Sequence, residues 1–459
     1  MVVQHNMQAA NANRMLNVTT GQQAKSTEKL SSGYRINRAA DDAAGLSISE
    51  KMRKQIRGLD KASSNAEDGV SSVQTAEGAL TEVHSMLQRM NELATQSANG
   101  TNSTTDRSAI QDEISQLTTE IDRVAETTKF NETYLLKGGD GTKLEYMKGH
   151  DAGLKGTLTD GTTTATFKVA AGALDEGKSV TIGGKDYTIG SAVADVQGAV
   201  DKLTTAGDKV TVNDKTYTYV AKDSAAPGGQ TVTKAGWVLD GDKTSTTGTT
   251  LTIANGDKVT TTPKTGASAS YTAAEMDNGV SKADPSIISA EKAVSLMKDE
   301  LIAANKVGVT NGTVEITGNP AYDKDNGVTF NINKGSAEVA NKLSFSLHVG
   351  SDADMTNKIT VGIETMNSSY LGIKGLNVND DSGIAGTYAI DAISDALQKV
   401  SDQRSSLGAV QNRLEHTIDN LDNVVENTTS AESRIRDTDM AKEMVNYSKN
   451  NILAQAGQS

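Results

Sequence analysis

The chain has 459 residues, no cysteine, a formal net charge of −13 and 3% aromatic residues, with one tryptophan. The lack of cysteine excludes disulfide and thiolate chemistry, and the acidic charge argues against binding to nucleic acid or to an anionic membrane surface. The sequence contains neither an apolar run long enough for a transmembrane helix nor the basic and apolar regions of a cleaved secretory signal.

Residues 1 to about 34 predict a weak amphipathic helix. Its apolar positions are sparse and comprise Met7, Met15, Leu16, Val18 and Leu30. We expect this helix to falter at Gly21, to stop at Gly33 and to be marginal by itself. The alternative is a disordered tail. Segment 35–45, RINRAADDAAG, has no clean period and is expected to be a solvated connector.

Two heptad rows of small and aliphatic residues predict a long helix from Gly58 to Ala98. The rows contain Leu59, Ala66, Val73, Leu80, Leu87 and Ala94, and Ala62, Gly69, Ala76, Val83 and Met90. Asn99-Gly100 should break this helix, because both residues readily take a positive φ. Ser103, Thr104 and Thr105 can cap a third helix that folds back on the second. Its apolar face contains Ile110, Ile114, Leu117, Ile121 and Val124.

Between about 138 and 370, threonine, glycine, aspartate and lysine become frequent and short alternating runs replace the heptads. Residues 180–189 and 210–219 each predict a β-hairpin, and two hairpins of one design suggest an internal duplication. The turns expected to join strands are Gly183-Gly184, Asn213-Asp214, Asn255-Gly256 and Asn311-Gly312. This region is predicted to form one or two hydrophilic, outward-facing β-rich domains.

Two short helices and one further hairpin are expected in the same region. One helix spans 193–203 and is ended by Gly207, and another is opened by Asp284-Pro285, because proline suits the first helical turn. Their apolar faces contain Val193, Val196, Val200 and Leu203, and Ala290, Val294, Met297 and Leu301. Alternation at 343–349 and 359–363 predicts a hairpin that returns the chain to the helical part.

A 3-4 alternation sustained for five heptads predicts one long helix over about 385–428. Its two rows contain Ile390, Leu397, Arg404, Gln411, Ile418 and Val425, and Ile393, Val400, Leu407, Leu414 and Leu421. The polar members Arg404 and Gln411 argue against a freestanding two-stranded zipper and favour packing against the N-terminal helices. Segment 430–441 is expected to be a second connector, followed by a final helix with Met444, Ile452, Leu453 and Ala456.

The predicted fold class is therefore mainly α, a helical bundle or coiled coil formed by both chain ends, with an inserted β-rich, α+β variable region. The expected divisions are a core helix with its connector at 1–45, the N-terminal part of the bundle at 46–140, the variable region at 141–340, the hairpin and C-terminal bundle helix at 341–430, and the second connector with a core helix at 431–459.

No pattern in the chain predicts an enzyme, a cofactor site or a metal site. The five histidines are scattered, and HExxH, GxGxxG, GxxxxGK[ST] and GxSxG motifs are absent. Asp323-Lys-Asp-Asn-Gly327 superficially suggests a calcium loop. Its glycine comes one position too early for an EF-hand and no glutamate follows at the required spacing, so a turn is the favoured interpretation.

Five long segments near the two ends resemble bacterial flagellin. They are LSSGYRINRAADDAAGLSISEKMR at 30–53, TAEGALTEVHSMLQRMNELATQSANG at 75–100, IQDEISQLTTEIDRVAETTKFN at 110–131, LGAVQNRLEHTIDNL at 407–421 and AESRIRDTDMAKEMVNYSKNNILAQAGQ at 431–458. The resemblance covers somewhat over half of the chain, in order at both ends. The middle resembles the family only in lying where flagellins vary.

The resemblance implies an extracellular structural subunit that self-assembles into the flagellar filament and serves motility. It implies a terminal coiled coil lining the filament core, a tube wall made by the bundle, and export by the flagellar type III apparatus. The implied partners are other flagellin subunits, an export chaperone and a cap protein, with no nucleic acid and no membrane. The family usually continues past AQAGQ with a short Leu-rich tail, so poor polymerisation and reduced signalling are expected from this chain.

The resemblance also implies recognition by a vertebrate Toll-like receptor through the bundle. Arg89, Leu93 and Glu113 match the family pattern, and Gln88 and Glu92 lie beside them. Arg89 would anchor by forked hydrogen bonds and Leu93 by burial. Alternatively, these residues form a surface between subunits. The expected bundle core comprises Leu80, Leu87, Ile114, Leu117, Ile121, Leu407, Leu414 and Leu421.

Three other interpretations stay open at this point. A flagellar hook–filament junction protein would share the end helices, although 75–131 fits a filament subunit better. The β-rich middle could instead carry an adhesin or glycan-binding module, but Trp237, Tyr217 and Tyr219 are too few for a clustered aromatic platform. The Thr- and Ser-rich middle could also be O-glycosylated.

Overall fold

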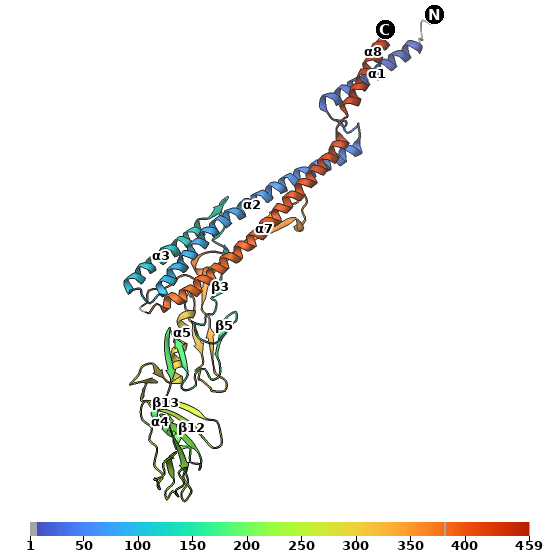
Figure 1. Cartoon of the computed structure of the whole chain (residues 1–459). Helices are drawn as coiled ribbons and strands as arrows, with labels where there is room; N and C mark the ends of the chain where they lie inside the picture. The colour runs from blue at the N-terminus through green and yellow to red at the C-terminus, as the bar shows by residue number, and fades with distance from the viewer. Residues whose placement is uncertain (1–6, 381, 459) are drawn as a thin grey trace.

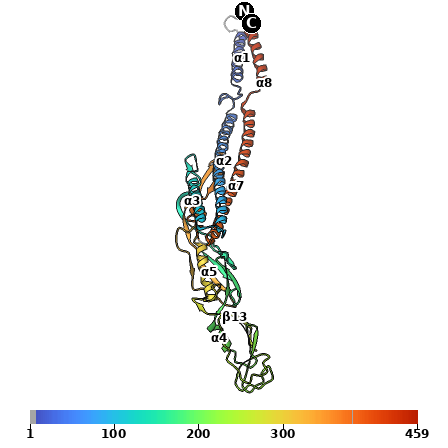
Figure 2. The same cartoon turned by 60° about the vertical axis from the view of Figure 1, so that its left-hand side comes forward.

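The computed structural model describes residues 7–380 and 382–458. The molecule is elongated, with a pair of terminal helices at one end, long helices in the middle and β-rich units at the other end (Figure 1). Segments from the two ends of the sequence lie side by side along the helical part, as the turned view also shows (Figure 2). None of the helices in the described ranges combines the length and hydropathy that crossing a bilayer requires.

The terminal pair consists of α1 (Met7–Ser32) and α8 (Met440–Gln458), which pack against each other. The first helix runs through Gly21 without a break, so the expected faltering there is wrong, because nothing at that position crowds or distorts the helix. It ends before Gly33, as predicted. Residues 1–6 of the predicted helix lie outside the described residues.

The second helix, α2 (Ala43–Ala98), is longer than the heptad rows indicate. It begins at Asp42, whose side chain accepts a hydrogen bond from the Gly45 N–H at 2.8 Å. The predicted start at Gly58 is wrong, because the first turns are stabilised by this cap and by polar contacts rather than by an apolar stripe. The predicted connector at 35–45 is correspondingly shorter. Every member of both predicted rows is buried.

A turn at 99–103 separates α2 from α3 (Thr104–Thr127). The helix breaks where predicted but not by the expected means, because Asn99 has φ −72° and Gly100 is not among the positive-φ residues. Of the three predicted candidates, Ser103 caps α3, and Asp106 completes a capping box with it. The buried Arg107 donates to the Ser97 carbonyl at 3.0 Å and to the Asp380 carbonyl at 3.1 Å, which holds this end of the bundle closed.

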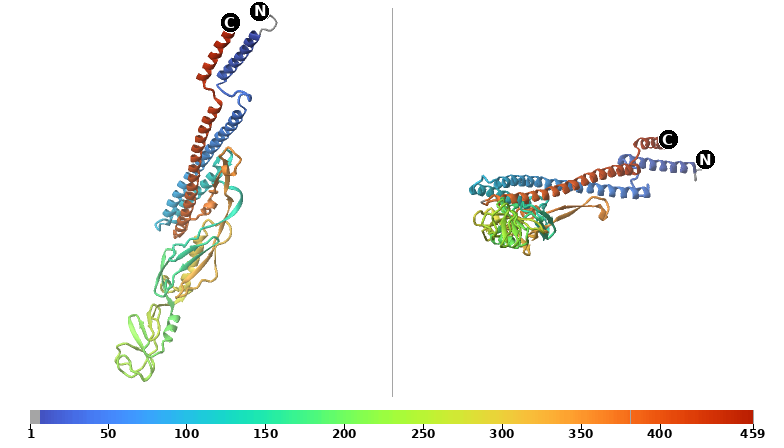
Figure 3. Two further views of the ribbon diagram at one scale, coloured as in Figure 1. Left: turned by 90° about the vertical axis from the view of Figure 1, so that its right-hand side faces the viewer. Right: turned by 60° about the horizontal axis from the view of Figure 1, so that its bottom comes forward.

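The long helix α7 (Ile384–Arg436) runs antiparallel to α2 along most of its length (Figure 3). Ser63 donates to Asp422 at 3.1 Å and Ser49 donates to Glu432 at 2.8 Å, which fixes the register. The predicted connector at 430–441 is mostly wrong, because α7 continues to Arg436 and α8 starts at Met440. Only three residues, 437–439, separate the two helices.

The two rows of α7 differ in burial. The row from Ile393 to Leu421 is buried throughout, whereas the row from Ile390 to Val425 is half-buried. The pair formed by α2 and α7 is covered by α3, which packs on α2, and by a β-hairpin. The hairpin consists of β20 (Leu343–His348) and β21 (Lys358–Ile363), with η1 (Met355–Asn357) in its loop. The predicted helical bundle is therefore completed by a β-hairpin.

The N-terminal and C-terminal halves meet again beyond the bundle. The short hairpin β1 (Lys129–Phe130) and β2 (Thr133–Tyr134) follows α3, and β3 (Gly139–Tyr146) pairs antiparallel with β19 (Ser336–Asn341). Asp122 of α3 accepts two hydrogen bonds from Ser368, which begins α6 (Ser368–Leu371), at 2.7 and 2.8 Å. These pairings return the chain from the variable region to the bundle.

The β-rich unit next to the bundle contains two sheets and one helix, and we call it the inner β unit. One sheet has the order β17-β18-β5-β4 and the other β14-β15-β16-β7-β6. Their bounds are β4 Thr157–Asp160, β5 Thr164–Val169, β6 Ser179–Ile182, β7 Lys185–Ile189, β14 Met276–Asp277, β15 Val280–Ser281, β16 Ile287–Ile288, β17 Glu315–Thr317 and β18 Val328–Asn333. Their core surrounds Phe167 and Phe330.

The helix of the inner β unit, α5 (Ala290–Asn305), begins at Ser289 rather than at Asp284-Pro285. The predicted opening is wrong because strand β16 lies between the proline and the helix, and Ser289 supplies the cap by accepting from the Lys292 N–H at 3.2 Å. The predicted apolar face is correct, since Val294, Met297 and Leu301 are buried.

The most distant unit, which we call the outer β unit, has one sheet with the order β11-β10-β9-β12-β13-β8 and the helix α4 (Val193–Asp201). Its strands are β8 Ser191–Ala192, β9 Lys209–Val212, β10 Lys215–Val220, β11 Gly236–Leu239, β12 Lys258–Thr262 and β13 Ala269–Ala274. Val196 and Val200, two members of the predicted apolar face, pack on the sheet together with Val210 and Val259, and α4 ends at Asp201, two residues before the predicted end.

Two of the four predicted hairpin turns join paired strands. Gly183-Gly184 connects β6 to β7 and Asn213-Asp214 connects β9 to β10, all with positive φ. No strand directly precedes Asn255-Gly256 or Asn311-Gly312, so neither turn joins two paired strands and these two predicted hairpins are wrong. The two real hairpins also have different neighbours in different sheets, so among the described residues the resemblance between them does not extend to the surrounding strands.

Candidate assembly and recognition surfaces

The terminal helices α1 and α8 expose large apolar side chains. In α8, Val445 is 68% and Ile452 is 66% exposed, whereas Ala454 on the side facing α1 is buried. The other exposed members of this terminal apolar surface are Met7, Met15, Val18, Met440, Met444 and Leu453. Single exposed apolar residues are ordinary, but a set of eight on one pair of helices marks an interaction surface.

A clasp of polar contacts joins the terminal pair to the bundle. The Arg35 N–H donates to the Arg436 carbonyl at 2.7 Å, and the Arg436 guanidinium lies 4.9 Å from the Tyr34 ring centroid. Arg436 also pairs with Glu50 at 2.9 Å. No periodicity in the sequence predicted this clasp, although both predicted connectors contain arginines and Tyr34 directly precedes the first connector. It sets where the terminal apolar surface stands relative to the bundle.

The residues expected to bind a receptor form a charged face across α2 and α3, with one exception. Arg89 pairs with Glu113 at 2.8 Å and with Glu92 at 3.1 Å, and the hydrogen bonds to Glu113 and then Glu92 raise the pKa of Arg89. Gln88 is exposed next to them, within 3.2 Å of His84. Leu93 is only 2% exposed, so it packs in the bundle core and is not available on the surface for the expected burial by a receptor.

The residues expected in the bundle core are brought together. Leu80, Leu87, Ile114, Ile121, Leu407, Leu414 and Leu421 are buried, and Leu117 is half-buried against the same core. Leu414 packs with Ala66, Val349 and Ile359. At Gly69 an added Cβ would lie 2.2 Å from Leu347 Cδ1 and 3.3 Å from Leu414 Cδ1, so a side chain there would force the Leu347 side chain of the hairpin to move. The seam between α2, α7 and β20 is closely packed.

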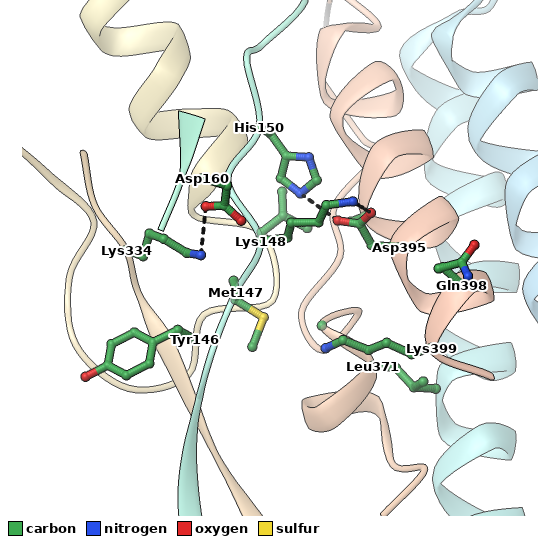
Figure 4. Close-up of a pocket in the computed structure, with 13 residues that line it drawn as sticks. Tyr146, Met147, Lys148, His150, Asp160, Lys334, Leu371, Asp395, Gln398 and Lys399 are labelled. Carbon is green, nitrogen blue, oxygen red and sulfur yellow. Dashed lines mark hydrogen bonds and ion pairs between the residues drawn. The ribbon is translucent and has the colours of Figure 1, made fainter. Parts of the chain in front are cut away.

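A cavity of about 250 Å³ lies where the bundle meets the inner β unit, and we call it the joint cavity (Figure 4). Asp395 of α7 accepts from Lys148 at 2.9 Å and lies 3.6 Å from His150 Nε2. Lys148 and His150 belong to the segment that leads from β3 into the inner β unit. The hydrogen bond to Asp395 raises the pKa of Lys148. This contact was not foreseen and ties the two parts together.

We expect Asp395→Asn to loosen this joint. The substitution keeps the shape of the side chain but removes the charge that faces Lys148 and His150. Because Lys148 is largely exposed and Asp395 is one-fifth exposed, the loss should be about 1 kcal/mol, between the values for surface and buried pairs. Faster limited proteolysis within 147–156 would report it, with Asp402→Asn on the exposed face of α7 as control. Equal cleavage rates in both variants would contradict the expectation.

The residues weighed for other chemistry do not assemble into a site. Asp323 and Gly327 are hydrogen-bonded to each other across a tight turn, and the Asp323 carboxylate accepts from the Asp325 N–H at 2.8 Å. Among the described residues, no three His, Cys, Asp or Glu side chains gather as metal ligands would. Trp237 is 5% exposed and packs against Tyr219, so these rings belong to the core of the outer β unit and do not form an exposed platform for a glycan.

Comparison with known proteins identifies relatives for the whole chain. Residues 3–140 match the bacterial flagellin N-terminal helical region, and residues 390–459 match the bacterial flagellin C-terminal helical region. A flagellin of Clostridium tyrobutyricum is 40% identical, with 100% of this chain and 97% of that protein aligned. Flagellin B of Vibrio anguillarum is 34% identical, with 100% of this chain and 94% of that protein aligned.

Solved structures give a weaker likeness. FliC from Burkholderia pseudomallei is 18% identical with a TM-score of 0.29, over 75% of this chain and 99% of that one. Flagellar hook associated protein-3 from Legionella pneumophila is 12% identical with a TM-score of 0.32, over 84% of this chain and 98% of that one. Structural similarity at this level does not distinguish a filament subunit from a hook–filament junction protein.

Proposed function

The chain belongs to the bacterial flagellin family, and from that premise we propose how its surfaces divide between assembly, export and recognition. It is a structural protein and not an enzyme. Its copies assemble with one another into the extracellular flagellar filament, which serves motility. The observation that carries the assignment of surfaces is the exposed apolar set on α1 and α8, and polymerisation of charge-substituted variants tests it.

Within the filament, we assign three layers. Segments 1–45 and 431–459 are proposed to line the inner core, and segments 46–140 and 341–430 to form the tube wall. Region 141–340 is proposed to face outward. The elongated shape supports this order, since the terminal helices and the β-rich units lie at opposite ends of the molecule (Figure 1). Head-to-tail contacts between copies that do not close into a ring would extend such a subunit into a helical filament.

Before assembly, the same terminal helices are proposed to meet other partners. A flagellar export chaperone would cover the exposed apolar residues of α8 and so prevent premature association. A cap protein would receive the subunit at the filament tip after type III export. Both partners exploit the same physical fact, that two marginal helices expose apolar surface until a neighbour buries it.

A second proposed role is recognition of the free subunit by a vertebrate Toll-like receptor. The exposed side chains Gln88, Arg89, Glu92 and Glu113 form the candidate face. Arg89 is its centre, because a guanidinium offers forked hydrogen bonds and arginine is frequent among residues that dominate interfaces. Leu93 supports this face from within the core rather than by contact with the receptor.

We expect Arg89→Ala to weaken binding of the monomeric chain to the receptor ectodomain by about tenfold or more, equivalent to about 1.4 kcal/mol or more. The matched control is Arg123→Ala, because Arg123 is an exposed arginine with an ion pair to Glu120 on the same helix bundle. Surface plasmon resonance measures both. Unchanged affinity for the Arg89 variant, or an equal loss for both, would assign this face to contacts between subunits instead.

A further inference from the structure

We propose that Glu176 is a proton-sensitive switch between the inner and outer β units, and that protonation of its carboxyl group makes their connection firmer. Figure 1 shows the outer β unit attached to the inner one through a narrow neck. The chain crosses this neck twice, at Gly190 between β7 and β8 and at Glu275 between β13 and β14. The inference is independent of the proposed functions, because the neck lies within the variable region and away from the terminal helices.

The two crossings of the neck lie close together. The Gly190 N–H donates to the Ile288 carbonyl of β16 at 2.9 Å. A Cβ at Gly190 would lie 3.0 Å from the Thr272 carbonyl oxygen of β13. Each crossing is a single residue between two strands, and each unit has its own sheets. A side chain that contacts both units can therefore affect how firmly the outer β unit is held.

Glu176 is such a side chain. It lies between β5 and β6 of the inner β unit, and its Oε1 accepts a hydrogen bond from the Ser191 hydroxyl of β8 in the outer β unit. Its other oxygen, Oε2, is buried and has no hydrogen-bond partner among the described residues. An ionised carboxylate in this position lacks hydrogen bonds that water would provide, which disfavours the charged form.

The charged groups around Glu176 do not compensate for its burial. Lys324, in the turn before β18, favours the ionised carboxylate, whereas Asp175 next to it and Asp195 in the first turn of α4 oppose it. The Asp175 carboxylate itself accepts from the Tyr322 hydroxyl at 2.8 Å. Burial has the largest effect, so the pKa of Glu176 is raised above its ordinary value.

The direction of the pH dependence follows from this raised pKa. When the neck opens, water solvates the Glu176 carboxylate and its pKa returns to the ordinary value of a glutamate. The closed neck therefore binds the proton at a higher pH than the open neck. The stability of the closed neck rises as the pH falls through the raised pKa, and the gain is complete below the ordinary value. We expect the outer β unit to be held more firmly at mildly acidic pH than at neutral pH.

The experiment uses the full chain as monomer with one spin label on each unit. Because the chain has no cysteine, labels attach only at introduced ones. Ser295→Cys on α5 and Lys215→Cys on β10 are exposed positions in the inner and outer β units. The distribution of distances between the labels, measured by double electron–electron resonance, should narrow on acidification. NMR titration of the Glu176 carboxyl carbon should give a raised pKa that coincides with the midpoint of this narrowing.

Three variants separate a switch from a passive contact. Glu176→Gln does not titrate, so it should give a narrow distribution at every pH. Ser191→Ala removes a hydrogen bond that favours the ionised carboxylate, so the midpoint should move to higher pH by about one unit. The matched control is Glu275→Gln at the other crossing. Glu275 is 62% exposed and pairs with Lys282, so this variant should respond to pH like the unsubstituted chain.

Three outcomes would overturn the proposal. One is a distance distribution that does not change with pH in the unsubstituted chain. Another is a pH response that persists in Glu176→Gln, because a different group would then control the neck. The third is an unchanged midpoint in Ser191→Ala, which would make the contact structural without a role in proton binding. The thermal unfolding of each variant is recorded first, and Ser191→Ala with the NMR titration keeps the test valid if Glu176→Gln does not fold.

Discussion

Ile452→Asp is expected to prevent filament growth while leaving the bundle folded. Ile452 is 66% exposed on α8, and burying such a side chain against a neighbouring copy contributes about 1.5–3 kcal/mol. An aspartate there loses that contribution and adds the desolvation of a charge. Since each 1.4 kcal/mol corresponds to a factor of ten, the critical concentration for polymerisation should rise at least about tenfold. Sedimentation and light scattering of seeded growth measure it.

The control for Ile452→Asp is Leu239→Asp in the outer β unit. Leu239 is also apolar and 36% exposed, but it lies at the end of the molecule opposite the terminal helices. The control should polymerise like the unsubstituted chain, and the thermal unfolding of the bundle should be unchanged in both variants. Normal growth of the Ile452 variant would mean that α8 presents a different face to its neighbour than the terminal apolar surface described above.

The extents of the long helices could be predicted where their buried residues repeat in heptads. They could not be predicted where polar contacts, not an apolar stripe, stabilise the helix. The row from Ile393 to Leu421 is buried along its length, because one stripe of α7 faces α2 and the β20–β21 hairpin. The first turns of α2 and the last turns of α7 have no such stripe. There the helices are prolonged by polar pairs, such as Arg436 with Glu50, which single-helix periodicity does not record.

The burial of Leu93 has a related cause. The two rows of α2 mark its seam with α7, and Leu93 belongs to neither row. It lies one turn beyond Arg89, and Arg89 pairs with Glu113 of α3, so both side chains lie on the face of α2 that α3 covers. The sequence placed Arg89 and Leu93 on the same face of α2. That Leu93 is buried there depends on how closely α3 packs, which the sequence pattern does not record.

The topology of the β-rich region could not be predicted, because its strands pair over long separations. Strand β18 pairs with β5 across most of the variable region, and β7 with β16 and β8 with β13 pair in parallel. Turn chemistry correctly located the local hairpins at Gly183-Gly184 and Asn213-Asp214. It did not distinguish them from Asn255-Gly256, where the preceding segment has no strand partner. The joint at Asp395 depends on this same long-range arrangement.

Leu414→Ala is expected to give the largest loss of stability among substitutions in the bundle. Leu414 is fully buried against Ala66, Val349 and Ile359, so its truncation removes apolar contacts from α2 and from the β20–β21 hairpin at once. Truncations of this kind cost about 2–5 kcal/mol, depending on how far the surroundings collapse. Chemical denaturation followed by circular dichroism would show the transition at lower denaturant, and the filament would dissociate at lower temperature.

Ile418→Ala provides the comparison that tests the physical reason. Ile418 lies one turn further along α7, is only half-buried and belongs to the row that faces the edge of the bundle. If burial against both α2 and the hairpin sets the cost, the Leu414 variant should lose at least about 1 kcal/mol more than the Ile418 variant. Equal losses would mean that the two rows of α7 contribute alike. In that case the seam formed by α2, α7 and β20 would not be what holds the two ends of the chain together.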